Sequence, residues 1–209
     1  MRIRGLGVAC VLACLVACGG THRAPSGPAM PAREYPGYLA STETLGRPFM
    51  VRQSLRGRYQ DHDLSLDVVV QLAKGKLTLV GLTPFGSRAF VLEQVGNETR
   101  FEKFVNREIP FDPKYVLNDV HRVFFRGLAG PQEDGVHSEE QHDEKVTETW
   151  RAGVLVERRF ERLDGDPAGA VIARFAGKPA PVIAPELTLE NQWFGYTIRI
   201  ASSDQRFLE

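Results

Sequence analysis

The sequence predicts a mainly β protein with few helices, built on a strongly curved antiparallel sheet. Two observations support this fold class. Short segments in which every second residue is apolar follow one another along the chain, and one segment departs from that pattern with apolar residues at helical spacing. About eight or nine strands in meander order favour a strongly curved sheet or a partial barrel.

The N-terminal segment has the features of a lipoprotein signal peptide. Two arginines precede an apolar core over residues 6–17, which ends in Leu15-Val16-Ala17-Cys18 and resembles a lipobox. The core is too short to span a membrane as a helix. We therefore expect residues 1–17 to be removed and Cys18 to carry an anchoring lipid; an uncleaved signal anchor is the alternative. Gly19 favours the outer membrane by resemblance to enterobacterial sorting rules.

Residues 18–37 are expected to form a Pro/Gly-rich tether, and residues 38–209 a single domain with one core. All three cysteines lie at or before Cys18, so the mature chain offers no thiol for a disulfide, a nucleophile or a metal. The two leader arginines come off the 26 basic residues, which leaves 24 against 26 acidic residues. This balance gives no reason to expect a nucleic acid partner.

Alternation of apolar and polar residues predicts strands with one dry face and one wet face. The clearest case is a hairpin of residues 63–72 and 77–81, joined by a turn at Ala73-Lys74-Gly75-Lys76. The further segments with period two are residues 87–95, 97–105, 145–151, 153–162, 171–175 and 194–200.

One segment has helical spacing instead. Asp112-Pro113 is typical of an N-cap followed by proline at the first helical position, and the apolar residues that follow predict a helix over 113–126 that packs on the sheet. A second helix is expected over 39–47. Residues 131–145 are acidic and almost without apolar side chains, so we expect a solvated, mobile loop there. Deletion of 132–144 should then change stability little.

Candidate residues for catalysis or metal binding are few. His137 and His142 lie among carboxylates, but their spacing on a polar segment is more typical of a solvated loop than of a metal site. Glu157 and Glu161 are explained by the wet face of a strand. The chain has no nucleophile-elbow, phosphate-binding glycine-loop or zinc-protease motif. The sequence therefore predicts no enzyme, no cofactor and no metal.

An apolar turn separates two of the predicted strands. In Gly81-Leu82-Thr83-Pro84-Phe85-Gly86-Ser87 a phenylalanine lies between proline and glycine, whereas turns in water are normally polar. One interpretation is that Phe85 folds back under the sheet as a core residue. The other is that Phe85 forms a hydrophobic tip that contacts a bilayer or an acyl chain.

This turn resembles the LolA/LolB family of periplasmic lipoprotein carriers and receptors. Residues 77–87 look like the LolB strand that leads into an Asn-Pro-Leu-Gly-Ser turn, whose leucine protrudes and helps to hand lipid to the membrane. Phe85 matches the position of that leucine, and Thr83 replaces the asparagine. Ile109-Pro110-Phe111 resembles the proline-led start of a helix in that family.

A more extensive resemblance, over most of residues 45–200, is to outer-membrane lipoproteins known only as a domain of unknown function. Their genes often lie among those for aryl polyene pigment biosynthesis. The shared motifs are short, and the acidic segment 131–145 has no counterpart. They are the lipobox at Cys18, a Pro-x-Gly turn at 84–86, a Val-Leu-x-Asp-hydrophobic helix at 116–120 and a terminal Asn-x-x-x-Gly-Tyr strand at 191–196.

The resemblance implies a half-open antiparallel barrel, capped by helices, around an apolar cavity that shelters acyl chains. Aromatic side chains would line such a cavity, but a packed core uses the same residue types, so both interpretations stay open. The candidate cavity residues are Phe90, Phe101, Trp150, Phe160, Phe175, Trp193, Phe194 and Tyr196.

The function implied is that of a non-enzymatic carrier or acceptor of a hydrophobic ligand at the periplasmic face of the outer membrane. Its partners would be a lipid or lipid-modified cargo, either lipoprotein acyl chains or an aryl polyene-type lipid. The first alternative is a structural or interaction module of an outer-membrane assembly. The second is an acyl-transfer or thioesterase enzyme.

Overall fold

The computed structural model describes residues 36–59, 62–106, 113–130, 132–177 and 180–209. These ranges belong to one compact unit, residues 35–209. The predicted signal peptide, Cys18 and all but the end of the tether lie outside the described residues, as do residues 109–112 before the predicted helix. Within the described ranges, no helix is long and apolar enough to cross a membrane.

Eleven antiparallel strands form a single sheet in the described part of the chain. The strand order is β5-β4-β3-β2-β1-β11-β10-β9-β8-β7-β6. Consecutive strands pair with each other, except β5 and β6, which form the two free edges of the sheet. The first and last strands, β1 and β11, pair in the middle. The sheet is therefore not closed. The strands are β1 Phe49–Tyr59, β2 His62–Ala73, β3 Lys76–Leu82, β4 Arg88–Val95, β5 Glu98–Lys103, β6 Gly135–Gln141, β7 Glu144–Arg151, β8 Val154–Arg162, β9 Ala170–Ala176, β10 Glu186–Asn191 and β11 Tyr196–Phe207.

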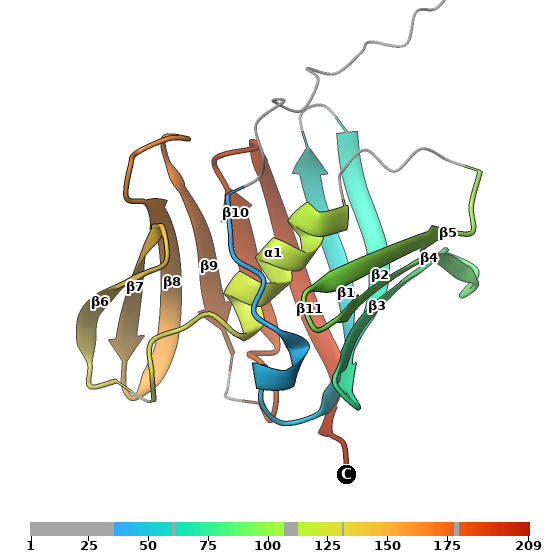
Figure 1. The fold of residues 1–209 in the computed structure, drawn as a ribbon, viewed down its shortest axis with the longest axis horizontal. Coiled ribbons are helices and arrows are strands. Elements are labelled where there is room, and N and C mark those ends of the chain that lie inside the picture. The colour runs from blue at the N-terminus through green and yellow to red at the C-terminus, as the bar shows by residue number, and fades with distance from the viewer. Residues whose placement is uncertain (1–35, 60–61, 107–112, 131, 178–179) are drawn as a thin grey trace, which may run out of the picture. The chain divides into compact units, whose positions relative to one another are not determined.

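The prediction of a mainly β, antiparallel fold is confirmed. Figure 1 shows α1 lying across one face of the sheet, with the β3–β5 end turned toward the same side. Three strands lacked a clear signal in the sequence. In β1, the inward-facing positions include the polar residue Gln53 and a glycine, Gly57, which interrupt the apolar alternation. Strand β6 is an exposed edge strand without apolar alternation, and β10 is short.

The helix α1, Pro113–Phe124, confirms the predicted helix and ends two residues earlier than expected. The prediction of a helix over 39–47 was wrong, because only the 3-10 turn η1, Thr42–Thr44, forms there. The Thr42 hydroxyl donates a hydrogen bond to the carbonyl of Gly75, which ties this turn to the sheet. Gly46 has a φ of +88°, which ends any helical continuation.

The two faces of the sheet differ as the alternation predicts. On the face that carries α1, Val68, Val70 and Leu72 are buried, and the core there includes Leu117 of the helix. On the opposite face, Arg174 of β9 bonds to carboxylates on both neighbouring strands, β8 and β10. The apolar side of the sheet is therefore covered mainly by α1, and the other side faces solvent.

The prediction that residues 131–145 form a solvated loop was wrong, because most of this segment lies in β6 and the start of β7. Glu139 and Glu140 on the edge strand are exposed, but Glu144 is buried. Its carboxylate lies 2.6 Å from Arg122 and 2.7 Å from Arg126, both on or directly after α1. A buried carboxylate is tolerated only with such partners, and the cations come from a distant part of the chain.

Substitution of Glu144 tests this ion-pair cluster. We expect Glu144→Gln to lower the free energy of unfolding by about 3–5 kcal/mol, because it removes the negative charge that lies between two buried guanidinium groups. Glu140→Gln, on the exposed edge, should change it by less than about 0.5 kcal/mol. Urea unfolding measures both, and equal midpoints would contradict the buried role of Glu144.

The structure also reverses the expectation for deletion of residues 132–144. This segment contains β6 and Glu144, so its deletion should be severely destabilising.

Candidate ligand-binding site

The predicted helix motif and the predicted terminal-strand motif meet in the structure. The Tyr196 hydroxyl donates a hydrogen bond to the Asp119 carboxylate on α1. Asn191 donates from its side-chain amide to the Tyr196 hydroxyl, at 3.0 Å, and its side-chain oxygen accepts from the backbone N–H of Phe194. These residues therefore fix the β10–β11 turn to the middle of the helix.

Arg158 of β8 binds the C-terminal end of α1. Its Nη1 donates to the carbonyls of Arg122 and Val123, at 3.0 and 3.1 Å, and its Nε lies 2.7 Å from a carboxylate oxygen of Glu148. Carbonyls of the last helical turn have no partner within the helix, so a buried cation stabilises this end. Burial lowers the pKa of Arg158, and the Glu148 charge offsets part of that effect.

Gly127 makes room for this guanidinium group. A Cβ at Gly127 would lie only 2.2 Å from Nη2 of Arg158 and 2.7 Å from a carboxylate oxygen of Glu148. The chain can therefore pass close to the ion pair only where it has no side chain.

Arg122 is fully buried at the centre of the same cluster. Besides Glu144, it bonds to the carbonyl of Pro36, at 2.6 Å, and to the Asp119 carboxylate, at 3.3 Å. Its guanidinium group lies 4.9 Å from the centroid of the Trp193 ring. The polar cluster under α1 balances three cations against three carboxylates and consists of Asp119, Arg122, Arg126, Glu144, Glu148 and Arg158.

On the other side of α1, His121 contacts β4. Its Nε2 lies 2.7 Å from Oε1 of Gln94, whose amide nitrogen donates to the carbonyls of Ala40 and Gly96. Gln94 therefore accepts at Oε1, and His121 carries its proton on Nε2. Burial, and then the charges of Arg126 and Arg122, lowers the pKa of His121 to about 4.

An apolar cleft of about 370 Å³ lies between the C-terminal end of α1, strands β7–β9 and the segment before β10. This volume falls in the range of about 300–1,000 Å³ that is typical of small-ligand sites. Arg158 is the charged member among the described lining residues, and its Nε and Nη1 atoms donate to Glu148 and to the helix carbonyls. The cleft is lined by Val123, Phe124, Trp150, Val154, Leu155, Arg158, Phe175, Ala176, Gly177, Ala180, Val182, Ile183 and Ala184.

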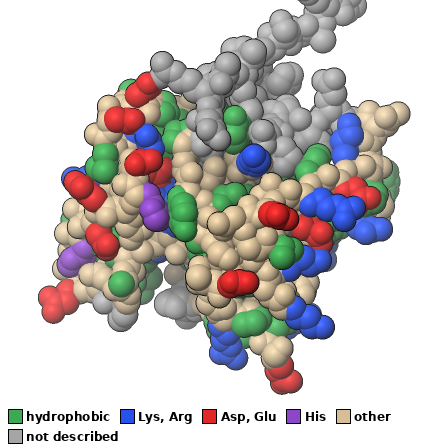
Figure 2. All heavy atoms as spheres, viewed as in Figure 1, with side chains coloured by type: hydrophobic (Ala, Val, Ile, Leu, Met, Phe, Trp, Pro, Cys, Tyr) green, Lys and Arg blue, Asp and Glu red, His purple; other side chains and the backbone are tan. Residues whose placement is uncertain are grey.

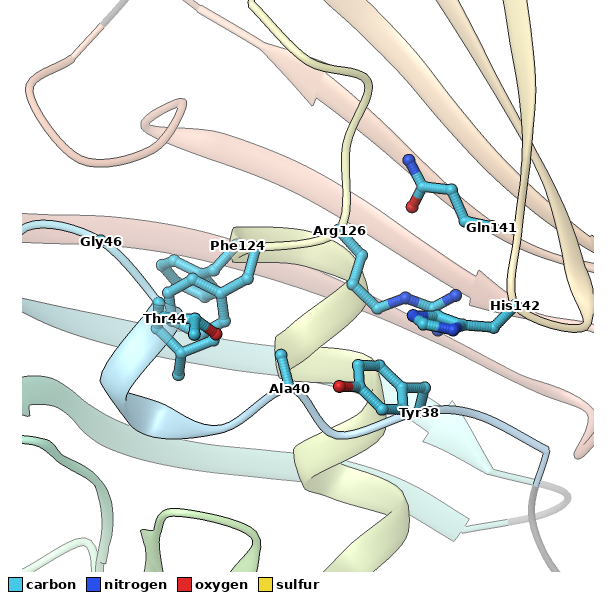
Figure 3. A pocket seen from close by; sticks show the side chains of 10 residues that line it. Tyr38, Ala40, Thr44, Gly46, Phe124, Arg126, Gln141 and His142 are labelled. Atoms are coloured by element: carbon cyan, nitrogen blue, oxygen red, sulfur yellow. The ribbon is translucent and has the colours of Figure 1, made fainter.

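A second pocket, of about 410 Å³, shares the Phe124 side chain with the cleft. Figure 3 shows Arg126, Gln141 and His142 on one side of this pocket, with Phe124 and Thr44 on the other. The ring of Tyr38 lies 4.0 Å from that of His142, centroid to centroid. The second pocket is therefore more polar than the cleft.

The structure separates the predicted aromatic set into two groups. Trp150 and Phe175 line the cleft. The others lie in the core or pack against it instead of lining the cleft. Phe90, Phe160 and Trp193 are buried, whereas Phe101, Phe194 and Tyr196 are partly buried.

The remaining candidate residues are also placed. Phe85 is 96% exposed, so it is not a core residue. His137 bonds to the carbonyl of Glu133, and the ring of His142 contacts that of Tyr38 in a tilted arrangement. In the described ranges, no group of three or more His, Cys, Asp or Glu side chains is arranged to hold a metal ion.

Sequence reasoning did not identify the polar cluster or most of the cleft. A signal was present for both. Arg122 and Arg126 lie one helical turn apart among residues expected to be buried, which indicates buried cations that need partners. Val182-Ile183-Ala184 is an apolar run between prolines, which is unusual for a connecting segment.

Comparison with known proteins gives a family and a set of distant folds. The profile of the family described as "Protein of unknown function (DUF3261)" matches residues 50–204. No curated protein matches the chain significantly.

Among solved structures, a LolA superfamily protein from Nitrosomonas europaea shares 13% identity over 82% of this chain and 95% of its own, with a TM-score of 0.44. A DUF1329 family protein from Desulfovibrio piger shares 11% identity over 79% of this chain and 87% of its own, with a TM-score of 0.41. A Vibrio parahaemolyticus domain, named provisionally for outer membrane lipoprotein sorting, shares 11% identity over 78% of this chain and 87% of its own, with a TM-score of 0.38. Such low values support no inference about function.

The pKa of His121 predicts how stability depends on pH. An unfolded chain takes up this proton below about pH 6.5, whereas the folded protein does so only below about 4. The free energy of unfolding should therefore fall by roughly 2 kcal/mol as the pH is lowered from 6.5 to 4.5, because of this one group. His121→Gln should remove that part of the slope, and His137→Gln should keep it. Urea unfolding across this pH range measures the free energy of unfolding of each variant. A pH dependence in His121→Gln as steep as that of the wild type would contradict the lowered pKa of His121.

Proposed function

We propose that this chain, which belongs to the family "Protein of unknown function (DUF3261)", binds a hydrophobic ligand of acyl-chain size in the apolar cleft beside α1. The observation that carries the proposal is the cleft itself, with an apolar lining and a volume of about 370 Å³. Each methylene group buried there contributes about 0.8 kcal/mol of transfer free energy. A flexible alkyl or polyene chain gains most from such a lining.

The environment that we propose is a membrane surface. The lipobox-like sequence at Cys18 supports lipid attachment after removal of residues 1–17. An acylated N-terminus would hold the domain at the periplasmic face of the outer membrane, where lipoprotein acyl chains or an aryl polyene-type lipid are candidate ligands. We propose that the ligand is bound and handed on without a catalytic step.

A structural or interaction module is the second candidate, and one observation favours it. Aromatic residues such as Phe160 and Trp193 are buried in the core, and the two pockets described above lie beside the C-terminal end of the helix. A module that only docks would need no ligand in the cleft. Native mass spectrometry of the protein purified from its own membranes separates the two, because a carrier should retain a lipid or pigment.

Filling the cleft tests the proposed binding site. We expect Ala180→Trp, in the cleft lining, to weaken binding of a dansyl-labelled undecanoic acid at least tenfold, about 1.4 kcal/mol, because an indole occupies the space of the chain. Ala129→Trp, at an exposed loop alanine outside the cleft, should bind the probe like the wild type. Fluorescence titration measures both affinities, and unchanged binding by Ala180→Trp would refute the cleft as the site.

Phe85 is proposed to contact the membrane during transfer. Because its side chain is 96% exposed, Phe85→Glu should leave the melting temperature nearly unchanged. It should nevertheless slow transfer of the dansyl probe to liposomes, since a carboxylate does not insert among acyl chains. Val95→Glu adds the same charge at an exposed apolar residue at the other end of β4 and serves as control. Transfer of the probe by Phe85→Glu at the wild-type rate would contradict the proposed contact of Phe85 with the membrane.

A further inference from the structure

Two exposed aromatic side chains lie at the same end of β4. Phe85 is in the turn before β4, and Phe104, 42% exposed, follows β5. The backbone N–H of Phe104 donates to the carbonyl of Ala89, at 2.9 Å, which holds it beside the start of β4. Phe85 lies three residues before Arg88, the first residue of β4, so the two Cα atoms are at most about 10 Å apart. Figure 1 shows this end of β3–β5 away from α1.

Basic side chains accompany these aromatic rings. The Arg88 guanidinium group lies 4.7 Å from the centroid of the Phe104 ring, a cation–π contact that fixes both groups. Lys103 is exposed and directly precedes Phe104. Glu102 of the same strand lies 3.9 Å from Arg100, so these two charges offset each other. Arg88 and Lys103 remain as net positive charges beside the rings.

The opposite edge of the sheet is acidic. Figure 2 shows acidic side chains gathered over β6–β8 and more basic ones over the β3–β5 side. An anionic surface would therefore attract the end of the sheet that carries Arg88 and Lys103 and repel the β6 edge, which orients the domain. The exposed acidic residues around β6 are Glu133, Asp134, Glu139, Glu140 and Asp143.

We infer that this end of the sheet docks onto an anionic phospholipid bilayer. The inference rests on the proposed function and gives it an orientation, because a lipid on Cys18 would attach the chain to a membrane at one point only. Aromatic rings enter the interface, and basic groups bind lipid phosphates. We call this the tip surface, and it consists of Phe85, Arg88, Lys103 and Phe104.

Vesicle co-sedimentation tests the tip surface. The protein is residues 18–209 with Cys18→Ser, which contain the whole compact unit and carry no lipid. It should bind vesicles of phosphatidylcholine with phosphatidylglycerol, bind pure phosphatidylcholine far more weakly, and dissociate as salt rises. Equal binding to both kinds of vesicle would overturn the inference.

Matched variants locate the binding. The structure repeats the Arg–Phe contact at Arg47 and Phe207, 4.2 Å apart, at the other end of the strands. Loss of one basic residue near an anionic membrane weakens binding by about fivefold. The double variant Arg88→Gln with Phe104→Ser should therefore weaken vesicle binding by more than about fivefold. The control variant Arg47→Gln with Phe207→Ser should bind vesicles like the wild type. Equal losses in the two pairs would overturn the tip surface.

Two further measurements separate loss of docking from loss of fold or of ligand binding. Arg88→Lys keeps the charge and should bind anionic vesicles within about twofold of the wild type, so it shows that the site tolerates substitution. The tip variants should bind the dansyl probe normally, and Ala180→Trp should bind vesicles normally. Wild-type vesicle binding by the tip variants would overturn docking alone, whereas wild-type probe binding by Ala180→Trp would overturn the cleft alone.

Discussion

The position of α1 depends on the buried ion pairs that join it to β7 and β8. Apolar packing is non-directional, so contacts with the sheet alone would let a helix slide. Glu144 lies between Arg122 and Arg126, one helical turn apart, and Arg158 binds the carbonyls where the helix ends. Each of these groups is costly to bury without its partner, so a displaced helix would lose all of the contacts together. Specific placement of the helix, more than net stability, is what such a cluster provides.

The cleft follows from this arrangement. Because α1 ends at Phe124, it does not cover β7–β9 completely, and apolar side chains of these strands line a free space beside the helix end. A fixed helix therefore fixes the size of the cleft, with Phe124 as the wall that separates it from the more polar second pocket.

The sequence predicted the strands with apolar alternation and α1 well, because their patterns are local. It did not predict that residues 131–145 form strands, since their acidic composition resembles that of a solvated loop. Glu144 can be buried only because Arg122 and Arg126 come near it in the fold, and no local pattern encodes that pairing. The aromatic residues raised the same difficulty. Trp150 in the cleft and Phe160 in the core belong to one chemical class, and only the course of α1 separates them.

The exposed acidic side chains of β6 have a consequence for contacts between copies of the protein. An open sheet presents unpaired backbone groups at its edge, and two such edges can pair and start aggregation. Glu139 and Glu140 are exposed on this edge strand, so two β6 edges that approach each other bring like charges together. Proteins anchored to a membrane, as proposed for this one, share a plane and meet often. Charge on the free edge would then keep a crowded layer of molecules separate.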